Sequence, residues 1–221
     1  MRKAYISIAA LLLCGSMLMA QTPANRTAKT TAADVLAQMP AAKQAAYNKL
    51  IGDLSSTGEE GVLMLVNMIN APGKGSNANV DYALSGLTHY VMAKGEENAR
   101  LVTAKAYLKA LEMVNERETK AFIIRQLQML GKDECIETLA SYLNDESLSG
   151  PAARALAANG SEKAGQALVA ALKRRSGSPK TQKDVIRAIA DAQVKEAETV
   201  LLALQGAADP NMQKEVLYAL S

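Results

Sequence analysis

Residues 120–127, KAFIIRQL, begin a pattern that occurs three times within residues 115–204. In the first copy, Gly131 follows, and then ETLASYL at 137–143. The other copies are AARAL at 152–156, Gly160 and QALVAAL at 166–172, and then DVIRAI at 184–189, Gln193 and ETVLLAL at 198–204. Each copy has the spacing of two short helices joined by a tight turn. Because such a pair cannot bury its apolar face alone, the copies must stack on one another.

Apolar spacing extends this pattern over most of the chain. Val62, Leu65, Val66 and Ile69 fall at i, i+3, i+4 and i+7, the spacing of one buried helical stripe, and the second half of each later copy repeats it. The first helices share recurring anchor residues, which are Leu50, Leu84, Leu127, Leu156, Ile189 and Leu220. The sequence therefore predicts an all-α fold over residues 32–221, an α-solenoid of about five helical pairs plus an incomplete terminal one.

Capping residues mark several of the expected helix ends. Thr57 with Glu60 forms a capping box, and Asn115 with Glu118 has a similar form. Two other starts combine a capping residue with a first-turn proline, at Ser178-Pro179 and Asp209-Pro210. Gly131 and Gly160 are expected to turn the chain within pairs.

The first twenty residues have the form of a secretory signal peptide. Arg2 and Lys3 precede an apolar run, and the small residue Ala20 precedes the expected cleavage point. Two alternatives remain open, a transmembrane anchor and lipid attachment at Cys14. The signal reading predicts export to the periplasm or beyond, no membrane span after cleavage, and a flexible lead-in over residues 21–31.

Charge and composition argue against nucleic acid as a partner. The chain has 25 Lys and Arg against 22 Asp and Glu, and removal of Arg2 and Lys3 leaves the two signs nearly balanced. A basic cluster around residues 173–183 follows a helix, where cations are expected, and no aromatic residue is interleaved for base stacking.

Candidate chemical groups are few. The glycine-rich loop at 71–79 has Lys74 in the wrong order for a phosphate loop, so we expect an inter-repeat connection there. His89 is the single histidine, and no residues stand at metal-ligand spacing, so we expect no metal, no cofactor and no catalytic residue. Cys135 is expected to be a packing residue. His89 and Tyr82 share a helical face opposite the core stripe and form a candidate interaction surface, with an ordinary solvated face as the alternative.

Residues 41–221 resemble the short HEAT-like repeats of the phycobilisome-lyase type, a resemblance that implies a scaffold and no lyase chemistry. A second likeness rests on TGEEGVLML at 57–65, APGKGSN at 71–77, YALSGL at 82–87, ETKAFIIRQL at 118–127 and LSGPA at 148–152. These stretches resemble the N-terminal HEAT region of certain secreted glycoside hydrolases. In that family a concanavalin-like domain of the 3-keto-disaccharide hydrolase type follows the repeats, and it would hold any catalytic residues.

Residues 212–220 repeat the first helix of a pair, with Val216 matching Val185 and Leu220 matching Ile189. We therefore expect Val216, Leu217 and Leu220 to form an apolar end that a neighbour covers.

The sequence favours an exported, non-catalytic scaffold that contacts a partner protein or a downstream domain. The scaffold is expected to associate with a secreted carbohydrate-active hydrolase. The alternative is that the chain is part of an enzyme that hydrolyses glycosides, with its catalytic domain beyond residue 221.

Overall fold

The computed structural model describes residues 27–174, 177–206 and 210–221, and all regular structure in these ranges is helical. The expected signal peptide at 1–20 and the possible lipid site Cys14 lie outside them. In chain order the helices are α1 (Ala28–Ala37), α2 (Gln44–Ser55), α3 (Gly58–Asn67), α4 (Ala78–Lys94), α5 (Glu97–Met113), α6 (Arg117–Leu130), α7 (Ile136–Ser141), α8 (Ser149–Asn159), α9 (Glu162–Arg174), α10 (Pro179–Asp191), α11 (Glu198–Gln205) and α12 (Pro210–Leu220). Short 3-10 turns, η2 (Asp133–Cys135) and η3 (Lys195–Ala197), lead into α7 and α11.

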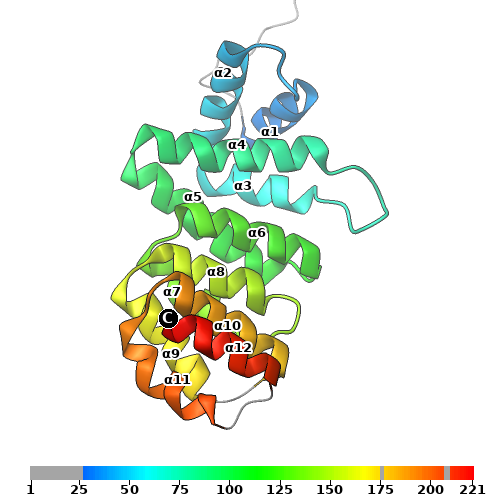
Figure 1. Ribbon diagram of the computed structural model, residues 1–221. Helices are drawn as coiled ribbons and strands as arrows, with labels where there is room; N and C mark the ends of the chain where they lie inside the picture. The colour runs from blue at the N-terminus through cyan, green and yellow to red at the C-terminus, as the bar shows by residue number, and fades with distance from the viewer. Residues whose placement is uncertain (1–26, 175–176, 207–209) are drawn as a thin grey trace, which may run out of the picture.

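The helices form an α-solenoid, as predicted (Figure 1). The first helices of successive pairs, α2, α4, α6, α8, α10 and α12, pack each against the next, and the second helices form the other layer. Five pairs, from α2/α3 to α10/α11, are followed by α12. The α1 helix packs against both members of the first pair, so it covers that end of the stack.

The core runs without interruption between the two layers. The anchor residues Leu84, Leu127, Leu156 and Ile189 are each at most 1% exposed. Alanine is frequent beside them, for example at Ala104, Ala152 and Ala188, and its small side chain lets neighbouring helices approach closely. Helix packing through one apolar stripe per helix therefore explains the stack.

Several helix ends differ from the sequence-based expectations. The α1 helix begins at Ala28, capped by the Thr27 hydroxyl, so helix replaces the expected lead-in from residue 28 onward. The capping box at Thr57 is wrong, because the Thr57 hydroxyl donates to the Leu54 carbonyl 2.5 Å away instead of accepting from α3. Asn115 does not cap α6, which begins at Arg117.

Two other expected ends are confirmed. The Ser178 hydroxyl accepts from the amide of Thr181 at the start of α10, which has Pro179 in its first turn. Gly160 ends α8 in the left-handed conformation, with φ of 68°, as expected of a C-cap glycine. Gly131 also follows a helix end, but its φ of −72° is one that any residue adopts.

The long connection between α3 and α4 is closed at its base by two asparagines. The Asn70 amide donates to the side-chain oxygen of Asn77 at 2.8 Å, and the Asn77 side chain donates back to the Asn70 carbonyl at 2.9 Å. The loop between them projects from the side of the stack (Figure 1). Both neighbours of this loop are helices, as the inter-repeat interpretation of residues 71–79 requires.

Candidate functional site: a tyrosine groove between α2 and α4

A groove of about 600 Å³ lies between the first helices of the first two pairs. Its walls carry aromatic rings and small residues, and its edges carry amide and charged groups. The residues that line it are Gln44, Tyr47, Asn48, Lys49, Gly86, His89, Tyr90 and Ala93. Tyr82, one helical turn before Gly86 on α4, extends the aromatic wall. We call this feature the tyrosine groove.

Two glycines make room for the tyrosine hydroxyls. A Cβ added to Gly86 would lie 2.2 Å from the Tyr47 hydroxyl oxygen, and one added to Gly52 would lie 3.1 Å from that of Tyr90. Each glycine therefore receives a ring from the opposite helix. Any larger residue at Gly86 would push Tyr47 out of its place.

The aromatic wall continues at the outer edge of the groove. The rings of Tyr47 and Tyr82 lie 5.3 Å apart between centroids, tilted by 50°, a geometry typical of favourable aromatic pairs. Partial burial, with a smaller effect of Tyr82, raises the pKa of Tyr47, so its hydroxyl stays protonated at neutral pH. Tyr82 itself is 43% exposed, so part of its side chain is accessible to a ligand.

Polar side chains occupy the rim. The Gln44 side chain donates to the Asn48 side-chain oxygen at 2.8 Å, and Lys49 pairs with Asp53 at 2.7 Å. His89 is exposed on α4 and lines the groove. Aromatic walls with a few polar groups at the edge suit a bound segment that is largely apolar.

The structure brings the predicted residues Tyr82 and His89 to this one surface. Tyr47 and Tyr90 belong to it too, and the sequence analysis missed both. Tyr47 lies on a different repeat, and its contact depends on the absence of a side chain at Gly86. The sequence feature that could have indicated this contact is the occurrence of one glycine within each of the two helices, Gly52 in α2 and Gly86 in α4.

The other predicted surface, at α12, is only partly accessible. Val216 is fully buried, so its inclusion in an open apolar end was wrong: it packs into the core, as its counterpart Val185 does. Leu220 is half-buried, whereas Leu217 is 52% exposed.

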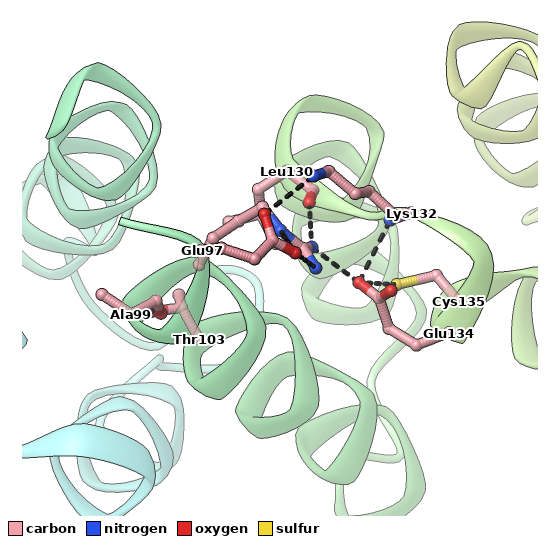
Figure 2. A network of polar contacts seen from close by, with 8 residues as sticks. Glu97, Ala99, Thr103, Leu130, Lys132, Glu134 and Cys135 are labelled. Carbon is pink, nitrogen blue, oxygen red and sulfur yellow. Dashed lines mark hydrogen bonds and ion pairs between the residues drawn. The ribbon is translucent and has the colours of Figure 1, made fainter. Parts of the chain in front are cut away.

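A buried arginine joins the second and third pairs. Arg100, on α5, is 4% exposed, and its Nη1 donates at 2.6 Å both to the Leu130 carbonyl at the end of α6 and to the Glu134 carboxylate in η2. Its Nε and Nη2 donate to Glu97 at 3.0 and 2.7 Å. Figure 2 shows Glu97, Leu130 and Glu134 directed toward a common centre. Glu134 is half-buried at this contact.

The groups around Arg100 form a structural joint without reactive character. Burial raises the pKa of the Cys135 thiol to about 12, and the nearby Glu134 carboxylate acts in the same direction. The thiol therefore stays protonated at neutral pH, and Cys135 is the packing residue expected from the sequence, fully buried.

Several charged side chains outside the two predicted surfaces form ion pairs. Lys163 pairs with Asp133 of the preceding pair at 2.8 Å, and Lys180 pairs with Asp184 at 2.7 Å. Within the described ranges, no three His, Cys, Asp or Glu side chains come together as metal ligands would. None of the helices in the same ranges is both long and apolar enough to cross a bilayer.

Comparisons with known proteins identify no family for the chain. No protein-family profile matches the chain, and no curated protein is significantly similar to it. Among solved structures, the crystal structure of an engineered protein aligns over 86% of this chain and 94% of its own, at 21% identity and a TM-score of 0.43.

Proposed function

We propose that the chain is a non-catalytic helical-repeat scaffold that binds a segment of a partner polypeptide in the tyrosine groove. The observation that carries the proposal is the convergence of Tyr47, Tyr82 and Tyr90 from two helices on one groove with glycines beneath the rings. Tyrosine is enriched at protein interfaces because it offers a large apolar area and a hydroxyl at low conformational cost.

The groove favours an extended segment over a bulky domain. It is open to solvent, and Tyr47 and Tyr90 line it from its two helices. Grooves lined by aromatic rings recognise proline-rich and other extended segments, whose side chains sit between the rings. The amides of Gln44 and Asn48 and the imidazole of His89 would pair with the partner's backbone.

The likeness to the repeat regions of secreted glycoside hydrolases suggests the setting. We place the scaffold in the periplasm or outside the cell, on the signal-like character of residues 1–20. The partner would then be a carbohydrate-active hydrolase or its catalytic domain. This chain would position that enzyme and leave the chemistry to it.

Site-directed photo-crosslinking tests the groove in the cell that makes the protein. A photoreactive phenylalanine analogue replaces Ala93 in the groove or, as a control, Met113 at the end of α5, and both positions are exposed. We expect a polypeptide adduct from position 93 and none from position 113. The adduct is identified by mass spectrometry, and the purified partner is then titrated against the wild type and against Tyr82→Ala.

Loss of the Tyr82 ring is expected to weaken partner binding at least tenfold, as at an interface hot spot. The Tyr82→Ala variant should keep its unfolding temperature, since the side chain is exposed. Equal adducts from both positions, or partner binding that Tyr82→Ala leaves intact, would contradict the proposal. Binding of a soluble oligosaccharide at this groove, without any polypeptide adduct, would replace it.

A further inference from the structure

One position of the repeat changes from buried to exposed at α12. Aligned on the anchor residues, this position holds Ile124 in α6, Ala153 in α8, Ile186 in α10 and Leu217 in α12. The first three are 0%, 1% and 0% exposed, and Leu217 is 52% exposed. The helices α6, α8 and α10 each pack against the next first helix. The Leu217 position therefore belongs to the surface that a following first helix covers in the rest of the stack.

Further apolar surface surrounds Leu217. The next residue, Tyr218, is 63% exposed, the highest value among the large apolar side chains in the described ranges. Tyr218 also lines a hollow of about 600 Å³, together with Val194, Leu201 and Leu220. We call this surface the α12 face.

The earlier contacts define what fits such a face. In α8, α10 and α12, the side facing the preceding first helix carries small or apolar residues at i, i+4 and i+7. These are Leu148, Ala152 and Ala155 in α8, Thr181, Val185 and Ala188 in α10, and Met212, Val216 and Ala219 in α12. All but Ala219, which is half-buried, are at most 5% exposed.

Charge adds a second criterion. A carboxylate stands at i+3 in α10 and α12, as Asp184 and Glu215. Arg187 of α10 binds Glu215 through two nitrogens, and Lys183 of α10 contributes to lowering the pKa of the Glu215 carboxyl. In α12 the place of Lys183 is taken by Lys214, an exposed cation, and the place of Arg187 is taken by Tyr218.

We infer that the α12 face binds an amphipathic helix of a partner protein, with small or branched apolar residues at i, i+4 and i+7 and a carboxylate at i+3. The apolar residues cover Leu217, and the carboxylate lies near Lys214. This helix continues the interface that already joins α6 to α8, α8 to α10 and α10 to α12. The α12 face is separate from the tyrosine groove, which lies on the first two pairs, so neither proposal depends on the other.

A peptide with the sequence of residues 178–191 supplies a defined probe, since α10 carries the required stripe and Asp184. A side-chain staple on its solvent face holds the helix, because a helix of this length is marginal in water. Fluorescence anisotropy measures its binding to the full chain. We expect a dissociation constant in the micromolar range, raised at least tenfold by Leu217→Asp.

Two controls address the face specifically. Met113→Asp, at a side chain that is 50% exposed far along the chain, should leave the affinity unchanged. The peptide variant Val185→Asp should not bind. Lys214→Glu should weaken binding at low salt and have less effect at high salt.

The inference is overturned by absence of binding up to about 1 mM peptide. Affinity that is the same for the wild type and Leu217→Asp would also overturn it. A self-associating wild-type chain that Leu217→Asp makes monomeric, with no peptide binding, would assign the α12 face to a second copy instead.

Discussion

The two halves of the stack join their helical pairs by different chemistry. Between α2 and α7, the joints bury polar groups, including Arg100 and Gln126, whose side-chain nitrogen donates to the Ser85 hydroxyl of α4 at 3.4 Å. Between α8 and α12, the joints bury mainly small and branched apolar side chains, such as Val185 and Val216, beside a hydrogen bond from the buried Ser149 hydroxyl to Asp184 at 2.6 Å. The Arg187–Glu215 pair lies at the rim.

This difference bears on what each half can accommodate. Hydrogen bonds inside the N-terminal joints are directional, so they fix neighbouring pairs in one arrangement. Apolar contacts in the C-terminal joints are non-directional, and their stabilisation is roughly proportional to the apolar area that they bury. A further helix with a similar apolar face can therefore pack there in the same way. The first half is thus suited to hold a shaped groove, and the second half to accept one more helix.

The largest effect is expected at the buried arginine. Arg100→Ala removes four hydrogen bonds, so the Leu130 carbonyl and the Glu134 carboxylate lose the guanidinium, and Glu134 keeps the Lys132 amide as a donor. Because removal of one member of a buried ion pair strands the other, we expect a loss of about 3 kcal/mol in unfolding free energy. Urea denaturation measures it. A loss no larger than that of an exposed arginine would remove the distinction between the two halves.

The next effect is expected at the floor of the tyrosine groove. In Gly86→Val, the new Cβ would lie 2.2 Å from the Tyr47 hydroxyl oxygen and 3.0 Å from Ile51 Cδ1. Tyr47 must therefore move away. We expect destabilisation of about 2 kcal/mol, as for other overpacked sites, together with loss of partner binding. Gly206→Ala is the matched control, since no atom lies within 4 Å of its added Cβ. Equal melting temperatures for both variants would show that the close approach of α2 and α4 does not matter.

Acid should weaken the polar joint selectively. Hydrogen bonds from Arg100 and then Lys132 lower the pKa of Glu97 to about 2, below its ordinary value of 4.5. A depressed pKa stabilises the folded chain above pH 4.5, and this contribution is lost as pH falls through about 2. Glu97→Gln should therefore destabilise the chain at pH 7 and make little difference near pH 2. Thermal melts at both values test this, with the exposed Glu60→Gln as the control. A Glu97→Gln effect that stays constant with pH would contradict it.

The smallest effect is expected at the rim of the C-terminal joints. The Arg187 side chain is 60% exposed in its pair with Glu215. Exposed pairs contribute little, so Arg187→Ala should cost less than about 1 kcal/mol, and less again at high salt. A cost equal to that of Arg100→Ala would mean that the two arginines hold their joints in the same way.

The apolar spacing was enough to predict the stack but not its polar joints. Leu127, Leu156 and Ile189 are buried as the repeat requires, because the helix period alone determines which side of a helix faces inward. Arg100 gave no such signal. Its partners Leu130 and Glu134 lie 30 and 34 residues away, and only the stacking of pairs brings them together.

The candidate sites divide in the same way. Tyr82 and His89 share a helical face, so the sequence placed them together, whereas Tyr47 joins them from another helix. Val216 was predicted at the open apolar end together with Leu217 and Leu220, although its match to Val185 is what its burial follows. The capping box at Thr57 failed because a hydroxyl can bond backward to a carbonyl as readily as forward to an amide.

The asparagine pair at the base of the α3–α4 connection makes that loop a natural attachment point. Since Asn70 and Asn77 hold the two ends together, the length of the chain between them is uncoupled from the packing of α3 against α4. Lengthening a closed surface loop costs little, because the entropy of closure grows only with the logarithm of its length. A fluorescent protein or an affinity tag inserted at Gly73, where a side chain would meet no atom within 4 Å, should report on the protein without disturbing the groove or the α12 face.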